Sequence, residues 1–366
     1  MCHFVKMTPS YWGLDEKPNE SSFVVADVKR VLVTGFEPFG GHMFNISQAV
    51  AERFDGKREL HNPWTNDRVV VDVEHAILSV DEAGSQQTAL RLRNGEDWDA
   101  ILHVGLCERC DVPRIERSAS NRLDMRIPDN QGRQLMNHAL DGNGSRGSWV
   151  DCTIWDAGTF PTSFEISTDA GSYLCNETYF RTLKQLVEPP HTSPLPPACL
   201  FLHLPDVDKI SVEDGVAFVE RCLTYMLHPV PPGTIDVVAA MLPTESGHLV
   251  LQRSMSKEEG GRWEYPGGKC EPGETWFAAM TRELHEELGI AVKPLHPLGA
   301  WLRYANGVPY VVHLISCEWS GDVSSIQLLD HEALLEIKDG SALPGAWAGR
   351  DEEMLAHLMT VVSNPG

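Results

Sequence analysis

Three glutamates in the second half of the chain, Glu283, Glu286 and Glu287, have the spacing of a metal-binding carboxylate group. Glu274 is expected to open a helix that ends at a cap glycine, Gly289. At about 100° per residue the three glutamates would share one face of it. Like charges three and four residues apart cost a helix about 0.2–0.5 kcal/mol per pair, which a bound cation would offset. A hard divalent ion that prefers oxygen ligands, Mg²⁺ or Mn²⁺, fits. The face therefore predicts a metal site for phosphate chemistry; a solvated acidic helix face is the alternative.

A second set of residues could carry out nucleophilic catalysis. Cys175 falls in the opening turns of a predicted helix, and His203 ends a predicted strand. Helix N-termini and nearby imidazoles favour the thiolate, which is the nucleophilic form of cysteine. Open α/β sheets place their sites at the carboxyl edge, so His203 could be the partner base, and Glu116 could orient its imidazole. From spacing alone, a structural cysteine and a structural histidine are the alternative.

Strands that alternate with helices must position these side chains. Strand-like runs at 31–35, 69–79, 100–104, 164–167 and 199–203 alternate with helical stretches from near Asn45, at 81–93, 171–186 and 211–226. That order predicts an α/β domain, a three-layer αβα arrangement with a mostly parallel sheet. A proline-rich segment reads as a stiff linker. A second α/β unit follows, with strands expected at 235–242, 248–252, 292–302 and 308–318 and a last helix at about 350–361. The predicted divisions are an extension at 1–29, domains at 30–226 and 235–366, and the linker at 227–234.

The composition restricts the partners. The chain has 366 residues, 42% apolar and 22% charged, with a formal charge of −22. That charge argues against a nucleic-acid polymer as partner, because such a surface needs clustered Lys and Arg. The chain shows no membrane-length apolar run and no secretory signal at its start, so we expect a cytoplasmic protein without a membrane partner. Nine irregularly spaced cysteines predict mostly reduced thiols, and Cys107 and Cys110 lack the second pair of a typical zinc site.

The stretch from Gly268 to Ile290 resembles the signature of the Nudix hydrolases at every fixed position: Gly268, Glu274, Arg282, Glu283, Leu284, Glu286, Glu287, Gly289 and Ile290. The resemblance implies an α/β/α sandwich with a mixed sheet. It also implies metal ligands at Glu283, Glu286, Glu287 and the Gly268 carbonyl, with Arg282 steadying Glu274. Glu283, or a carboxylate from another loop, would be the general base.

Flanking residues resemble the MutT-type group, which hydrolyses nucleoside triphosphates, including oxidised ones. Residues 263–269 and 252–253 carry this likeness. The block that begins at Asp330 implies a further carboxylate near the metal, with Asp where the group has Glu. The block that ends at Asp351 implies a residue that reads the base. The implied substrate is a small nucleotide.

Five blocks resemble the type I pyroglutamyl peptidases in family order, at 33–41, 116–121, 126–130, 170–176 and 202–205. The resemblance implies a catalytic triad of Glu116, Cys175 and His203, which needs no cofactor. It also implies substrate contacts by Phe36, Phe39, Asn45, Arg126 and Ile127. The substrates would be short peptides that begin with pyroglutamate.

One block departs from this family. Residues 105–109 read Gly-Leu-Cys-Glu-Arg, where many bacterial members have Gly-Gln-Ala-Gly-Gly. The leading interpretation is a bifunctional hydrolase with one activity in each domain. The alternative is that one domain is a catalytically inactive binding module, for example a nucleotide sensor that controls the peptidase.

Overall fold

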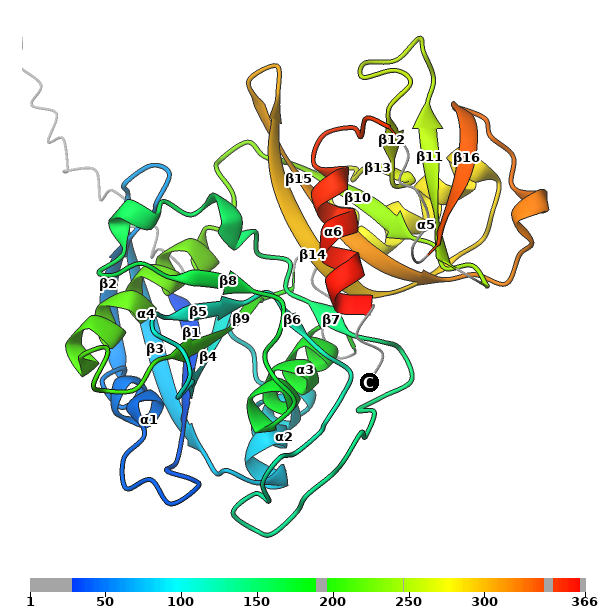
Figure 1. Cartoon of the computed structure of the whole chain (residues 1–366). Coiled ribbons are helices and arrows are strands. Elements are labelled where there is room, and N and C mark those ends of the chain that lie inside the picture. Colours follow the sequence, from blue (N-terminus) through cyan, green and yellow to red (C-terminus); the bar gives the residue numbers. More distant parts are fainter. Residues whose placement is uncertain (1–27, 189–195, 246, 339–344, 363–366) are drawn as a thin grey trace, which may run out of the picture.

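The computed structural model describes residues 28–188, 196–245, 247–338 and 345–362, which form two lobes (Figure 1). The predicted N-terminal extension lies almost wholly outside the described residues. The first lobe contains the sheet from β1 to β9 and the second contains β10 to β16. Both are α/β, as the alternation of strands and helices predicts.

A seven-stranded sheet forms the centre of the first lobe, in the order β2-β3-β1-β4-β9-β5-β8. Pairing is parallel for β1 with β3 and β4, for β4 with β9, and for β5 with β8. The pairs β2 with β3 and β5 with β9 are antiparallel. The mostly parallel sheet is thus confirmed. Its strands are β1 (Lys29–Phe36), β2 (Gly56–His61), β3 (Arg68–Leu78), β4 (Ala100–Leu106), β5 (Arg114–Glu116), β8 (Glu165–Ser167) and β9 (Ala198–Leu204).

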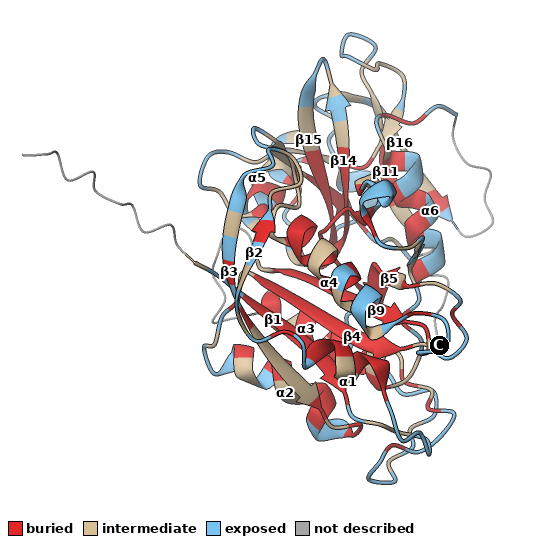
Figure 2. Ribbon diagram, turned by 90° about the vertical axis from the view of Figure 1, so that its left-hand side faces the viewer, coloured by how far each residue is buried: buried red, intermediate tan, exposed pale blue. Residues whose placement is uncertain are grey.

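Helices cover both faces of this sheet because its central strands are apolar on both sides. In β1, Leu32 packs with α2 (Glu82–Arg93) and α3 (Leu174–Leu186). Its neighbours Val31 and Val33 pack with α1 (Ile46–Ala51) and α4 (Val212–Leu227) on the other face. Figure 2 shows β1, β4 and β9 as the buried centre of the lobe. These three buried strands position the residues at their carboxyl ends.

The second lobe has a mixed four-stranded sheet, β13-β10-β15-β14, and a three-stranded antiparallel sheet, β12-β11-β16. Apolar residues of α5 and of α6 belong to separate clusters, so the lobe has a core on each side of its strands. Strand β16 and the short β12 and β13 were not predicted. The elements are β10 (Ile235–Met241), β11 (Gly247–Arg253), β12 (Trp263–Glu264), β13 (Gly267–Lys269), α5 (Trp276–Leu288), β14 (Lys293–Ala305), β15 (Val308–Glu318), β16 (His331–Lys338) and α6 (Asp351–Val362).

Helix α5 begins two residues later than expected. The side chain of Thr275 accepts from the Ala278 N–H and is the N-cap, so Glu274 lies in the preceding loop and not in the first turn. The C-terminal end agrees with the prediction, since Gly289 has φ 66° and caps the helix. The shift matters because it frees the Glu274 carboxylate to meet Arg282 across the loop.

The two lobes share a close-packed interface. The short hairpin of β6 (Ser118–Ala119) and β7 (Arg146–Gly147) lies against β14. A Cβ on Gly147 would be 1.8 Å from the Leu298 carbonyl oxygen, so only glycine fits there. Asp151 Oδ2 accepts hydrogen bonds from Leu302 N at 2.8 Å and from Arg350 Nη1 at 2.7 Å. These contacts bind the lobes through specific backbone and side-chain groups.

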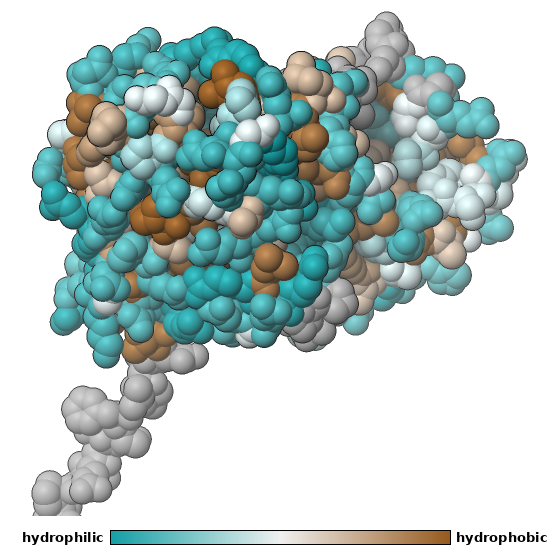
Figure 3. Space-filling model, turned by 90° about the horizontal axis from the view of Figure 1, so that it is seen from below, coloured by the Kyte–Doolittle hydropathy of each residue, from teal (hydrophilic) through white to brown (hydrophobic). Residues whose placement is uncertain are grey.

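The surface is mostly hydrophilic on the face that Figure 3 shows, with small scattered apolar areas. No helix among the described residues has both the length and the apolar character that a membrane crossing requires.

Candidate active sites

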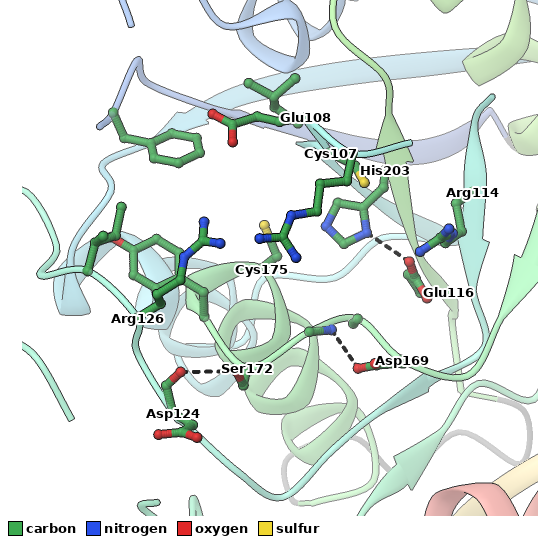
Figure 4. Close-up of a pocket in the computed structure, with 17 residues that line it drawn as sticks. Cys107, Glu108, Arg114, Glu116, Asp124, Arg126, Asp169, Ser172, Cys175 and His203 are labelled. Atoms are coloured by element: carbon green, nitrogen blue, oxygen red, sulfur yellow. Dashed lines mark hydrogen bonds and ion pairs between the residues drawn. The ribbon is translucent and has the colours of Figure 1, made fainter. Parts of the chain in front are cut away.

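The triad residues predicted in the first lobe converge at one end of its sheet. Cys175 is the second residue of α3, His203 is next to last in β9, and Glu116 ends β5. Strands β5 and β9 pair directly, with Arg114 opposite His203. The three side chains line a cavity of about 410 Å³ (Figure 4). The imidazole lies between the thiol and the carboxylate in that view.

The histidine is held by the carboxylate. His203 Nδ1 and Glu116 Oε1 are 2.8 Å apart, and both residues are buried. Burial by itself lowers the pKa of His203. Hydrogen bonds with Cys175 and Glu116, and the charges of those two groups, outweigh burial and raise the pKa to about 10. The arrangement therefore favours an imidazolium between two acidic partners, which is the order of groups in a catalytic triad.

A glycine makes room for the Cys175 thiol. A Cβ built on Gly105, in β4, would lie 3.1 Å from Cys175 Sγ and 2.8 Å from the ring of Phe201. The absence of a side chain at Gly105 lets the thiol sit over the end of the sheet. The packing of β4 against the start of α3 thus fixes the position of the sulfur.

The predicted substrate residues divide into two groups. Phe39, Arg126 and Ile127 line the cavity with the triad. Phe36 is buried behind it, with its ring 6.3 Å from that of Phe201. Asn45 is the N-cap of α1, and its side chain bonds to Ser47 and to the Glu37 carbonyl. Neither Phe36 nor Asn45 lines the cavity, so their predicted substrate contacts are not apparent in this geometry.

Sequence reasoning missed several residues of this cavity. Tyr173 lines it and donates to the Pro128 carbonyl, and Arg114 lines it while paired with Glu165. Cys107 and Cys110 form a disulfide at its rim, whereas the other six described cysteines are free, as expected. The Cys-Glu-Arg-Cys spacing was the only sequence signal of that bond.

In the second lobe, strand β13 and helix α5, which contain the predicted metal ligands, lie against each other. A Cβ on Gly268 would be 2.3 Å from the Glu283 carboxylate, which shows how closely that group approaches the loop. Glu287 accepts from Gly267 N at 3.3 Å. Glu286 is on the same helix but is largely exposed. Two of the three glutamates therefore point at the loop, and the third borders it.

Arg282 contacts carboxylates from both the helix and the loop before it. Its guanidinium bonds Glu274 at 2.8 Å and 3.0 Å, Glu283 at 2.8 Å and the Lys269 carbonyl at 2.9 Å. It also reaches Glu286 at 3.3 Å. One arginine thus ties the loop to the helix and partly neutralises the acidic face.

The site has excess negative charge that suits a cation. Burial raises the pKa of Glu287 to about 7, with Glu264 and Glu283 adding to the rise and His331 opposing it. Across the described part of the chain, no three His, Cys, Asp or Glu side chains form a ready metal site. The donor set fits a divalent ion nonetheless, because carboxylates that repel one another beside a carbonyl are what Mg²⁺ and Mn²⁺ bind.

The last two predicted residues lie apart from these glutamates. Asp330 is exposed and bonds Lys257 at 2.9 Å, whereas the side chain of the next residue, His331, is 2% exposed and lies 3.0 Å from Glu264. Asp351 begins α6, is nearly buried, and accepts from Tyr265 N at 2.8 Å. Burial raises the pKa of Asp351 to about 7. The role of Asp330 as a metal ligand stays a prediction, and the neighbouring His331 is a residue of this block that the sequence did not single out.

Known proteins match each lobe separately. The family described as pyroglutamyl peptidase matches residues 29–224, and the family described as NUDIX domain matches residues 234–358. The pyrrolidone-carboxylate peptidase of Thermococcus litoralis is 31% identical over 164 residues, which are 43% of this chain and 69% of that protein. The CTP pyrophosphohydrolase of Escherichia coli is 32% identical over 127 residues, which are 35% of this chain and 93% of that protein.

Both matches agree with the resemblances found in the sequence. The first covers more than half of the chain, and the second spans nearly all of a separate enzyme. The chain is therefore a hydrolase that belongs to the pyroglutamyl peptidase family and carries a Nudix domain after it.

Proposed function

We propose that the first domain removes pyroglutamate from the N-terminus of short peptides. The observation that carries this is the pairing of His203 with Glu116 at 2.8 Å in the same cavity as Cys175. The Cys175 sulfur attacks the carbonyl carbon that links pyroglutamate to the next residue. His203 then gives its proton to the departing amine, and a thioester remains. Water hydrolyses the thioester with His203 as base, releasing pyroglutamate and free thiol.

The cavity supports this substrate class by its size and lining. A pyroglutamyl ring is small and mostly flat, and Phe39 and Ile127 offer apolar surface to it beside the nucleophile. Phe39 packs at 6.2 Å from the ring of Tyr173, which restrains its position. Arg126 offers a cation to a carbonyl oxygen or carboxylate of the peptide. Phe36 and Asn45, buried behind the cavity, would act on the substrate only by positioning these residues.

The test is hydrolysis of a pyroglutamyl-aminocoumarin reporter by the purified full chain. We expect release of aminocoumarin from this reporter and none from the matched prolyl and glutamyl reporters. Cys175→Ala should abolish release while leaving the far-UV circular dichroism unchanged. Release by Cys175→Ala at the wild-type rate would remove Cys175 as the nucleophile.

We further propose that the second domain hydrolyses nucleoside triphosphates to the monophosphate and pyrophosphate. The observation that carries this is the approach of the Glu283 carboxylate to Gly268 under the guanidinium of Arg282. Glu283, Glu286, Glu287 and the Gly268 carbonyl would hold Mg²⁺ or Mn²⁺, which when bound polarises a phosphoryl oxygen and lowers the barrier to attack by water. Glu283 is the proposed base, and Arg282 keeps it in place.

The substrate is proposed from the relative and from the residues around the site. A CTP pyrophosphohydrolase is the relative that the domain spans almost fully, so cytidine triphosphates join oxidised purine triphosphates such as 8-oxo-dGTP as candidates. Asp351 is the proposed base-reading group. Asp330 would enter the metal site only by releasing Lys257, its partner at 2.9 Å.

The test is a panel of triphosphates with Mg²⁺, in which products are separated by chromatography. Pyrophosphate and a monophosphate in equal amounts are the expected products from one or a few members. Glu283→Gln should lose this activity. Inorganic phosphate and a diphosphate as the products would show cleavage at a different bond and contradict the proposal.

A further inference from the structure

We infer that the Cys107–Cys110 disulfide is a redox-modifiable element that positions the substrate-binding loop of the peptidase site. The inference rests on the proposed peptidase function and adds a thiol–disulfide control to it. The bond closes a turn at the rim of the cavity that contains Cys175 and His203.

The turn is a direct continuation of the strand beside the nucleophile. Strand β4 ends at Leu106, and Cys107 N still donates to Leu204 O at 2.8 Å, so the strand geometry extends to Cys107. Residues two apart on a strand face the same side. Gly105 faces Cys175, with its built Cβ 3.1 Å from the sulfur, and Cys107 therefore faces the cavity as well. Figure 4 shows Cys107, Cys175 and His203 around this one space.

The chain then reverses within the disulfide ring. Cys110 N donates to Cys107 O at 3.2 Å, and Lys209 Nζ donates to Cys110 O at 2.9 Å. The two residues enclosed by the ring, Glu108 and Arg109, both line the cavity. The covalent bond thus determines how these two charged side chains are presented to a substrate.

Glu108 connects the turn to the loop that carries Phe39. Glu108 Oε1 lies 2.6 Å from His42 Nε2. His42 N donates to Phe39 O at 3.0 Å, and the rings of His42 and Phe39 are 6.1 Å apart. Between them, Gly40 and Gly41 have φ of 61° and 89°, and such a pair of glycines gives the backbone little restraint of its own. The contact with Glu108 is therefore a restraint on the position of Phe39.

The two sulfurs differ in their exposure to solvent, and this decides which of them a reductant attacks first. Cys107 is half-buried at the open cavity, whereas Cys110 is 3% exposed. A dithiol reductant would attack Cys107 Sγ as a thiolate, forming a mixed disulfide and releasing Cys110 as the thiolate. The second thiol of the reductant then displaces Cys107. The protein gains two thiols, and the reductant, which supplies the two electrons and two protons, becomes a disulfide.

Reduction should weaken substrate binding because the turn loses its closure and Glu108 holds His42 less firmly. The probe is pyroglutamate itself, titrated calorimetrically into full-length Cys175→Ala protein, so that the redox state of the nucleophile does not enter. We expect the Kd to rise about tenfold, or about 1.4 kcal/mol, after treatment with dithiothreitol. A Cys175→Ala, Cys107→Ser, Cys110→Ser protein should have the weaker Kd with and without reductant.

Two further variants test whether the disulfide acts through Glu108 and whether the effect of the reductant is specific to Cys107 and Cys110. In the Cys175→Ala background, Glu108→Gln should weaken binding while the disulfide stays intact by mass spectrometry. Cys270→Ser, at a half-buried cysteine of the other domain, should bind and respond to reductant as its parent does. An equal Kd in both redox states, or alkylation of Cys107 and Cys110 without prior reduction, would overturn the inference and leave the peptidase assignment intact. Absence of pyroglutamate binding in both states, together with no reporter cleavage by the wild type, would overturn the peptidase function and the inference with it.

Discussion

The Glu116→Gln substitution tests the triad most closely, because it changes a single charge. Glu116 is fully buried, and its Oε1 is 2.8 Å from His203 Nδ1. Its Oε2 has no hydrogen-bond partner, so the contact with His203 is the main interaction that the carboxylate group makes. The amide of glutamine has nearly the same shape. We therefore expect the fold to survive and the function to change.

The magnitude follows from the hydrogen bond that is lost. A hydrogen bond to a charged group contributes about 1.5–3 kcal/mol, which corresponds to a factor of about 10 to 100 in rate. If the amide N–H of the glutamine faces His203, it also favours the wrong tautomer of the imidazole. The comparable change in a serine triad lowers kcat by a factor of about 10⁴. The expected loss in kcat/KM for the pyroglutamyl reporter thus lies between about 10-fold and 10⁴-fold.

The same substitution has a pH signature. The pKa of His203 is raised to about 10 in the folded protein, by Cys175 and Glu116 against the effect of burial, and is about 6.5 when unfolded. The stabilisation from this raised pKa is complete below about pH 6.5 and is lost as pH rises through about 10. Glu116→Gln removes part of the rise. The stability advantage of the wild type over the variant should therefore shrink between pH 6.5 and 10.

The assays are reporter kinetics and chemical denaturation of both proteins at pH 6.5, 8 and 10. Glu213→Gln, at a side chain 75% exposed on α4, is the matched control and should behave as the wild type. A loss in kcat/KM of less than about fivefold, which is below the weakest expected hydrogen bond, would refute the role of Glu116. A stability difference that grows toward pH 10 would refute the sign of the pKa argument.

Three further predictions concern the second site and the interface. Gly268→Ala would place a Cβ 2.3 Å from the Glu283 carboxylate; nucleotide hydrolysis should fall at least about 100-fold with reporter cleavage retained, and equal loss of both would point to misfolding. Removal of divalent metal with a chelator should abolish pyrophosphate release and leave reporter cleavage unchanged; loss of reporter cleavage would contradict the metal-free triad. Gly147→Ala would place a Cβ 1.8 Å from Leu298 O and should lower the Tm by at least about 4 °C in calorimetry, whereas an unchanged Tm would show that the lobes do not depend on this contact.

The sequence was most informative where one local pattern determines the structure. Strands β1, β4 and β9 each contain a short apolar run, and the helix of the glutamates ends at a glycine, so both were predictable from hydrophobic pattern and capping. The proposed triad of Cys175, His203 and Glu116 came from spacing and resemblance. Its geometry depends on the pairing of β5 with β9, a contact across 87 residues between Glu116 and His203 that no local pattern encodes.

The predictions fared less well where long-range packing selects among neighbouring residues. In the block that begins at Asp330, β16 starts at His331, whose side chain lies 3.0 Å from Glu264, whereas Asp330 precedes the strand and bonds Lys257. The substrate contact of Asn45 stays a prediction, and the capping of α1 by its side chain was not foreseen. The disulfide and the interface formed by β7 and β14 depend on tertiary proximity. Short strands such as β12 and β13 carry too few residues for a period to be seen.

The central claim is that one chain holds two independent active sites, and a crossed assay tests it most directly. Reporter cleavage and pyrophosphate release would be measured on the wild type, Cys175→Ala and Glu286→Gln under identical conditions with Mg²⁺. The account predicts that Cys175→Ala loses only reporter cleavage and that Glu286→Gln loses only pyrophosphate release. If either substitution abolished both activities in a folded protein, or if each variant kept both, the assignment of two separate sites would be contradicted.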